Sequence, residues 1–326
     1  EDRLVDVMRP LAAFARKHRA RPTLGYTHLQ PAQLTTVGKR ASLWLQDFED
    51  DLHAVRHVLD TLKFRGVKGT TGTQASFLEL FNGDHDKVKK LEKMVAKACG
   101  FTDCYPVCGQ TYPRKVDARI LHSLTGIAIS ISKMTNDIRY LQSVGEIEEP
   151  FGKKQIGSSA MAYKRNPMRS ERADSLARLI LSLTSSPEMT AATQFLERTL
   201  DDSANRRIAI PEAFLAADAI LIIARDIVSG LVVNSSVIAR RVAEALPFMA
   251  TETLMMMAVA RGKNRQDVHE RIRTHAMDAV TAVRKGSEND LIDRLAGDSG
   301  IGLSRDEITD ALNAESFVGR APEQVV

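Results

Sequence analysis

Apolar side chains recur every three or four residues in the middle of the chain, from residue 114 to residue 144. Their spacing is close to the 3.5-residue repeat that packs helices side by side, and it is held for more than three heptads. It predicts one helix about 45 Å long, longer than the helices of most compact domains. We expect this helix to join a bundle that continues across a subunit interface; a bundle within one chain is the alternative. The repeated positions are Val116, Ile120, Leu124, Ile127, Ile131, Met134, Ile138 and Leu141.

The same period predicts further helices on both sides. Pro167 suits a first helical position, where it loses no hydrogen bond, and the run Asp201-Asp202-Ser203 offers N-capping side chains for another helix that ends near Gly230. No segment bounded by turns alternates apolar and polar residues with a period of two, so we predict an all-α fold. Long helices are expected over residues 2–19, 35–62, 167–183 and 204–229, and shorter ones over 235–245, 247–261, 264–284, 288–295 and 304–312.

The change from long to short helices places a domain boundary between residues 230 and 235. Residues 1–233 are therefore predicted to form a central helical-bundle domain. Residues 234–326 are predicted to form a smaller C-terminal helical domain.

Composition and charge are those of an ordinary globular protein. Apolar residues make up 44% and charged residues 26% of the 326 residues, which excludes disorder of the whole chain. The formal net charge is +4 without a long run of one sign, so we expect no nucleic-acid binding through bulk electrostatics. No stretch of eighteen apolar residues is present, so no membrane span is expected. Three cysteines, at 99, 104 and 108, fit neither a disulfide framework nor a zinc site, which favours reduced thiols in a cytoplasmic protein.

Three segments do not fit the helical period and are candidates for chemistry. Residues 23–32 link two helices and carry His28 between polar neighbours, whereas the glycine-rich residues 66–74 follow no strand and so do not form a dinucleotide fingerprint. Residues 157–167 bring backbone amides, two hydroxyls and Lys164 to a helix N-terminus, which suits an anion. A serine-rich surface loop beside a solvated basic helix is the alternative. Guanidinium groups follow in the same region at Arg165, Arg169 and Arg172.

A second basic helix start lies after Ser203. Arg206 and Arg207 fall in its first turn, where the helix macrodipole disfavours cations. A bound anion would account for them, and so would neutralisation by Asp201 and Asp202.

Together these segments resemble one enzyme family. Residues 157–167 read Gly-Ser-Ser-Ala-Met-Ala-Tyr-Lys-Arg-Asn-Pro, which is similar to the Gly-Ser-Ser-x-Met-Pro-x-Lys-x-Asn-Pro loop of the fumarase/aspartase superfamily. Three more stretches narrow the resemblance to the adenylosuccinate lyase family, animal type, and it extends from about Pro22 to Ala321. They are Tyr-Thr-His-Leu-Gln-Pro-Ala-Gln from residue 26, Lys-Phe-Arg-Gly-Val-Lys-Gly-Thr-Thr-Gly-Thr-Gln-Ala-Ser-Phe from residue 63, and Arg-Thr-Leu-Asp-Asp-Ser-Ala-Asn-Arg-Arg from residue 198.

The resemblance implies an anti β-elimination that needs no metal or organic cofactor. Its expected substrates are adenylosuccinate, which yields AMP and fumarate, and the related succinylated carboxamide ribonucleotide of purine synthesis. It implies that Ser158 is the general base, that His28 protonates the departing nitrogen, and that Lys164 and Asn166 hold the substrate's carboxylates. The other substrate-binding positions that it implies are Thr27, Gln110, Arg172, Arg198, Ser203 and Arg207.

The same resemblance implies a homotetramer whose active sites are shared between subunits. The chain departs from the family at Ala162, where proline is usual, and we expect a more mobile loop and a modest loss of turnover. The start Glu1-Asp2-Arg3 has neither an initiator methionine nor a signal peptide, and the family's N-terminal domain is absent. We therefore interpret the chain as the interior of a longer protein, with little activity expected from these residues alone.

Two other functions stay open at this stage. One is another lyase of the superfamily, such as argininosuccinate lyase. The other is a non-catalytic structural protein of the crystallin type.

Overall fold

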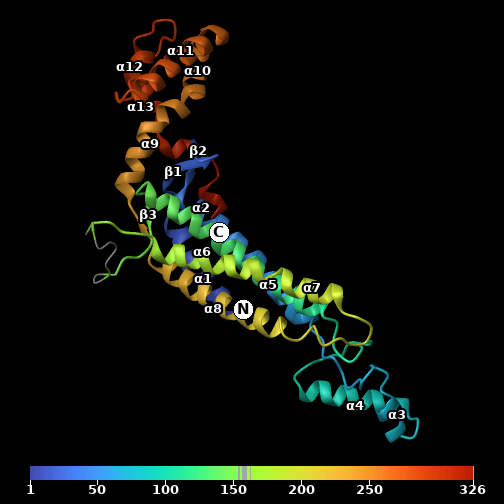
Figure 1. Cartoon of the computed structure of the whole chain (residues 1–326). Coiled ribbons are helices and arrows are strands. Elements are labelled where there is room, and N and C mark those ends of the chain that lie inside the picture. Colours follow the sequence, from blue (N-terminus) through green and yellow to red (C-terminus); the bar gives the residue numbers. More distant parts are fainter. Residues whose placement is uncertain (153–154, 156–159, 162, 326) are drawn as a thin grey trace. The chain divides into compact units, whose positions relative to one another are not determined.

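The computed structural model describes residues 1–152, 155, 160–161 and 163–325 and is mostly helical (Figure 1). The predicted helical fold is confirmed, except for two short antiparallel strand pairs. The chain divides into two compact units. Helices α1 (Asp2–Lys17) and α2 (Val37–Thr61) each begin in one unit and end in the other. The first unit comprises Glu1–Pro10, Trp44–Gln142 and Glu149–Leu231, and the second Leu11–Leu43, Ser143–Glu148 and Val232–Val326.

The first unit is built around long helices. The helix predicted over residues 114–144 is α5, and most of its repeated apolar positions are buried. Trp44 of α2 donates a 2.7 Å hydrogen bond to Asp137 of α5, and α6 packs along α8 with buried alanines in both helices (Figure 1). After α1 and α2, the helices of this unit are α3 (Ala75–Leu80), α4 (His85–Ala98), α5 (Lys115–Ser143), α6 (Met168–Leu183), α7 (Ser185–Thr193) and α8 (Arg206–Ser229).

The second unit combines a β-hairpin with shorter helices. In its C-terminal part Leu254, Ile272, Leu291 and Ile308 belong to one buried apolar cluster. Its helices are α9 (Ser235–Met249), α10 (Thr251–Ala260), α11 (Arg265–Arg284), α12 (Leu291–Ala296) and α13 (Arg305–Ala311), followed by short 3-10 turns at Ala314–Phe317 and Pro322–Gln324. Its strands are β1 (Pro22–Thr27), β2 (Gln30–Thr36), β3 (Ile147–Glu148) and β4 (Val232–Val233).

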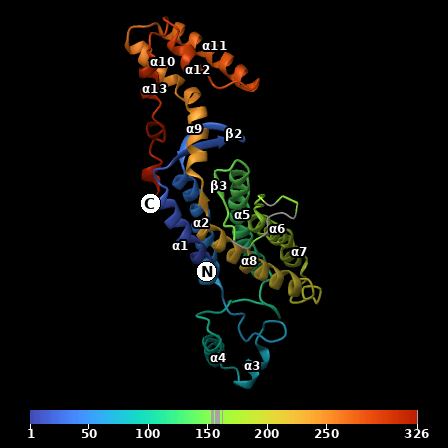
Figure 2. The same ribbon diagram turned by 90° about the vertical axis from the view of Figure 1, so that its left-hand side faces the viewer.

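The two exceptions to the helical prediction are the two-residue pair of β3 and β4 and the longer hairpin of β1 and β2. Residues 23–32 were expected to be an irregular link between helices, but residues 22–36 form an antiparallel pair. Figure 2 shows the hairpin beside α9, which packs against both strands. The two-residue alternation expected of a strand is interrupted inside β1, where the pairing register with β2 shifts between Leu24 and Tyr26.

Among the described helices, none alone is long and apolar enough to cross a membrane. Only α9 and α10 taken together reach that length and hydropathy, and they are bent by 46° at the break between them. Ala250, Leu254, Met255 and Ala258 from this pair belong to the buried cluster of the second unit.

A buried carboxylate that forms no ion pair with any described basic residue lies in α2 of the first unit. A Cβ atom at Gly126 of α5 would come within 2.6 Å of Asp51 Oδ1, and Asp51 Oδ2 has no hydrogen-bond partner among the described residues. Burial raises the pKa of Asp51 to about 6; a hydrogen bond with Ser130 opposes this shift, and the nearby charges of Asp47 and Asp50 add to it. The folded chain thus binds this proton more tightly than the unfolded chain, so stability falls as the pH rises from about 4 to 6.

We therefore expect Asp51→Asn to stabilise the protein, and to do so more at higher pH. The free energy of unfolding should increase by up to about 3 kcal/mol at pH 7.5 and by about 1 kcal/mol at pH 4.5. Urea denaturation at the two pH values measures this, with the exposed Asp50→Asn as the matched control. A pH-independent loss of stability in Asp51→Asn would contradict the assignment.

Candidate active site

His28 lies at the tip of the hairpin in an unusual backbone conformation. Thr27 pairs with Gln30, so His28 and Leu29 alone form the turn, and both have positive φ, 53° and 58°. Two-residue hairpin turns of this kind normally contain glycine, asparagine or aspartate. Histidine and leucine each hold this conformation at a cost of about 1–3 kcal/mol, and such strain clusters at functional sites. Thr27 and His28 are exposed, so the imidazole is presented to solvent on a short, tight turn.

The body of the hairpin is held by contacts that the sequence analysis did not find. Gly25 allows the strands to approach, because a Cβ atom there would lie 2.6 Å from the carbonyl oxygen of Gln33. Tyr26 donates a 2.7 Å hydrogen bond to Glu146, a fully buried carboxylate just before β3. Arg241 of α9 donates to the same carboxylate at 2.9 Å. Glu146 and Arg241 belong to no local sequence motif. Only their contacts in the folded chain distinguish them from charged residues on the surface.

In the first unit, the structure brings Gln110 and Arg198 together. The backbone amide of Gln110 donates to the carbonyl of Glu197 at 3.1 Å, and the Arg198 guanidinium donates to Gln110 Oε1 at 3.4 Å. Gly109 permits this approach, since a Cβ atom there would lie 2.7 Å from Glu197 O. Two predicted substrate-binding side chains thus share one surface, formed by the loops before α5 and α8.

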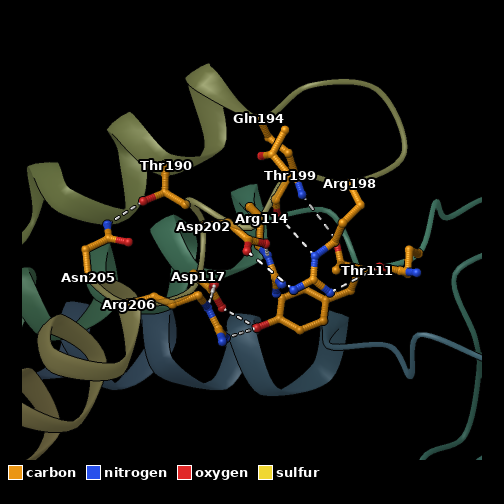
Figure 3. Close-up of polar contacts among 12 residues, drawn as sticks. Thr111, Arg114, Asp117, Thr190, Gln194, Arg198, Thr199, Asp202, Asn205 and Arg206 are labelled. Atoms are coloured by element: carbon orange, nitrogen blue, oxygen red, sulfur yellow. Dashed lines mark hydrogen bonds and ion pairs between the residues drawn. The ribbon is translucent and has the colours of Figure 1, made fainter.

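Beneath this surface lies a buried ion pair. Arg114 Nε donates to Asp202 Oδ2 at 2.6 Å, and both side chains are almost completely buried. Asp202 Oδ1 is 3.8 Å from Arg198 and, like Thr199 Oγ1, is buried without a hydrogen-bond partner among the described residues. Asp202 therefore provides a fixed negative charge behind the exposed Arg198 guanidinium (Figure 3).

The start of α8 differs from the prediction in two respects. The N-cap is Asn205 rather than the run ending in Ser203, and its side-chain amide donates to Ser186 and Thr190. Arg206 forms its ion pair with Asp117 of α5, at 2.9 Å, and the charge of Asp202 adds to the stabilisation of its cation. Arg207 is exposed and forms no ion pair with a described residue, so it is the cation of this helix start that is available to an anion.

The start of α6 is already occupied by a carboxylate of the chain itself. Glu149 accepts hydrogen bonds from the backbone amides of Arg169, at 3.0 Å, and Ser170, at 2.9 Å, and from the Ser170 hydroxyl at 2.9 Å. These two amides in the first turn of α6 are therefore not available to a substrate anion, whereas the anion site expected at residues 157–167 stays a prediction. What this helix start offers instead is Lys164 and Arg172, whose side chains are exposed.

The other arginines near this helix start have structural contacts. Arg169 pairs with Asp226 of α8 at 2.6 Å, and Arg165 lies over the ring of Phe151 at 5.4 Å. Asn166 is half-buried, and its carbonyl accepts from the Met168 amide at 2.8 Å. Ser158 and Ala162 lie outside the described residues.

The predicted site residues are divided between the two units. Thr27 and His28 belong to the second unit. Those of the first unit are Gln110, Lys164, Asn166, Arg172, Arg198, Ser203 and Arg207.

Comparisons with known proteins identify the family. A lyase family matches residues 2–181, and the family described as adenylosuccinate lyase C-terminus matches residues 247–326. Adenylosuccinate lyase of Saccharomyces cerevisiae is 52% identical over 324 residues, which is 99% of this chain and 67% of the relative. Adenylosuccinate lyase of Schizosaccharomyces pombe is 50% identical over 323 residues, with the same coverage of both chains. This chain thus spans about two thirds of the length of these relatives.

Solved structures agree on the fold. The 3-carboxy-cis,cis-muconate lactonizing enzyme of Pseudomonas putida superposes with a TM-score of 0.85 at 21% identity, and a fumarate lyase of Mesorhizobium with 0.82 at 22% identity. Each match covers 99% of this chain and 70% of the solved chain. The sequence identities, the two family matches and the shared fold lead to one assignment: the chain belongs to the adenylosuccinate lyase family.

Proposed function

We propose that the chain catalyses the adenylosuccinate lyase reaction, the anti β-elimination of fumarate from adenylosuccinate to leave AMP. The same reaction would act on the succinylated carboxamide ribonucleotide of purine synthesis. The observation that carries the proposal is the 52% identity to the yeast enzyme over 99% of the chain. A different lyase specificity, such as argininosuccinate cleavage, and a non-catalytic crystallin-like role have no comparable support.

An anti elimination needs a base and an acid on opposite faces of the Cα–Cβ bond, which becomes the double bond of fumarate. We assign Ser158 as the base that takes the Cβ proton and His28 as the acid that protonates the departing nitrogen. The Cβ–H electron pair becomes the double bond of fumarate, and the C–N pair leaves with the nitrogen. Histidine is suited to this task because its side chain titrates near neutral pH, whereas serine must be activated by nearby positive charge.

Removal of a proton next to a carboxylate places a second negative charge on that carboxylate in the transition state. Cationic and hydrogen-bonding groups directed at this charge lower the barrier. Exposed Lys164, with Asn166 beside it, supports this role, and Lys164 also supplies the charge that would activate Ser158. The remaining binding positions that we propose for this polyanionic substrate are Thr27, Gln110, Arg172, Arg198, Ser203 and Arg207.

We also propose a homotetramer with shared active sites, in which His28 of one subunit meets Ser158 of another. Large apolar side chains left exposed on α8 support an interface there: Phe214, Leu215 and Ile222 are 48%, 65% and 46% exposed. The division into a central domain of residues 1–233 and a C-terminal domain of residues 234–326 belongs to this proposal. So does a cytoplasmic location, which the three free cysteines support.

An absorbance assay with adenylosuccinate tests the proposal, because cleavage of the C–N bond changes the purine spectrum. We expect turnover of adenylosuccinate with stoichiometric fumarate, undiminished by EDTA, and no turnover of argininosuccinate. Turnover of argininosuccinate alone would transfer the assignment to the other lyase. Binding of AMP and fumarate without turnover would favour a non-catalytic protein.

A further inference from the structure

Glu146 is the centre of a buried polar cluster beneath the hairpin, and no step of the proposed mechanism uses it. Its side chain is 1% exposed and accepts hydrogen bonds from Tyr26 Oη at 2.7 Å, Arg241 Nε at 2.9 Å and Thr23 Oγ1 at 3.3 Å. Arg40 of α2 lies 4.0 Å away. One carboxylate therefore joins β1, the first turn of α2 and α9, through residues that all belong to the second unit.

The charges in this cluster favour a fixed arrangement. Two guanidinium groups face one buried carboxylate, so loss of Glu146 would leave both cations without this buried partner. Burial, together with the hydrogen bond to Glu146, raises the pKa of Tyr26 to about 12. The phenol thus stays a hydrogen-bond donor at every pH at which the enzyme would work.

The cluster forms hydrogen bonds with β1, the strand that leads directly into the turn containing His28. Glu146 accepts from Thr23 and Tyr26, and Arg40 also donates to the carbonyl of Leu24. Tyr26 is only two residues before His28. Because a turn with two non-glycine residues at positive φ persists only when its surroundings hold it, β1 needs an anchor of this kind close to the tip.

We propose that Glu146 is a positioning residue, which fixes the His28 turn through Tyr26 and thereby aims the imidazole at the substrate. This inference rests on the proposed function, in which His28 is the general acid. A purely structural ion pair would stabilise the second unit without affecting the geometry of the turn. The two roles therefore differ in what happens to the turn when the Tyr26 hydroxyl alone is removed.

The first test is Tyr26→Phe, which removes one hydroxyl and keeps the ring. In the intact protein we expect kcat for adenylosuccinate to fall about 5–30-fold with KM within twofold, because the turn loses one charge-assisted hydrogen bond that holds it and His28 acts on the leaving group. Amide hydrogen exchange of Thr27–Gln30 should become at least several-fold faster, while the melting temperature changes little. Glu146→Gln should have larger effects on kcat and on exchange, and it should also lower the melting temperature because Arg241 and Arg40 lose a buried anionic partner. Glu244→Gln is the matched control, an exposed carboxylate on α9 that pairs with Arg240.

A second variant distinguishes positioning from simple stabilisation. Leu29→Gly relieves the strain at the other residue of the turn, so it should restore part of the kcat lost in Tyr26→Phe. A structural role alone predicts no such rescue. Unchanged kcat and unchanged exchange at the turn in both Tyr26→Phe and Glu146→Gln would overturn the proposal.

Failure of the proposed function gives a different result. If the unaltered protein does not cleave adenylosuccinate, the kinetic comparison is lost, but faster exchange at Thr27–Gln30 in Tyr26→Phe still reports whether Glu146 fixes the turn.

Discussion

Replacement of His28 by asparagine should lower kcat for adenylosuccinate by about 10²–10⁴-fold, the usual contribution of a positioned general acid. Asparagine is the informative choice because it tolerates the left-handed conformation that residue 28 adopts, with φ of 53°. The hairpin should therefore stay folded and the melting temperature should be unchanged or slightly higher. The lost activity would then reflect the missing proton donor and not a damaged turn.

Leu29→Gly is the matched control for that experiment. Leu29 shares the turn, has φ of 58° and is 69% exposed, so glycine there should stabilise the hairpin and leave kcat within a few-fold. Circular dichroism melts and steady-state kinetics on the two variants distinguish loss of the proton donor from a change in the conformation of the turn. Equal losses of activity in both variants would mean that the turn's shape, and not the imidazole, is what matters.

The helices could be predicted because their determinants are local. The segment expected over 114–144 is α5, Lys115–Ser143, and most positions of its apolar repeat are buried. A helix start predicted at Pro167 was one residue early, since α6 begins at Met168 with Pro167 as its N-cap. In each case the signal lies within one continuous segment of the chain.

The hairpin could not be predicted for the opposite reason. Its turn contains histidine and leucine where asparagine and glycine are usual, and a register shift at Gly25 interrupts the alternation of β1. Such a strand is stable because Glu146, some 120 residues away, holds Tyr26. A turn that is suboptimal on its own can be specified only by tertiary contacts, which are not visible in a local pattern.

In the candidate site, too, some features could be predicted from the sequence and others depend on tertiary contacts. The resemblance to the family placed Gln110 and Arg198 in one site, and the structure brings them together. It gave no indication that Glu149 occupies the amides of α6, or that Asp117 neutralises Arg206, because those partners are 20 and 89 residues away. Charged residues at a helix start suggest an anion, but only the fold shows whether that anion belongs to the ligand or to the protein.

The largest loss of activity should come from Ser158→Ala. We expect kcat to fall by at least about 10²-fold, since no neighbouring side chain of the sequence is a better base at that position and general bases contribute on this scale. Ser159 provides the matched control, because Ser159→Ala removes the same hydroxyl one residue along and should retain activity within a few-fold. Calorimetric titration of Ser158→Ala with adenylosuccinate should give nearly normal affinity, because Arg198, Arg207 and Lys164 are unaltered.

Exchange of the substrate's Cβ proton with D₂O separates the base from the acid in the same experiments. A variant that lacks the acid can still remove the proton and return it, so His28→Asn should incorporate deuterium into unreacted adenylosuccinate while releasing little fumarate. Ser158→Ala should lose both exchange and fumarate release, because the first bond can no longer be broken. If Ser159→Ala loses exchange and Ser158→Ala keeps it, the base is the second serine. If both serine variants keep exchange, proton removal belongs to a group outside this loop, and His28 and Ser158 do not act as the acid–base pair of this enzyme.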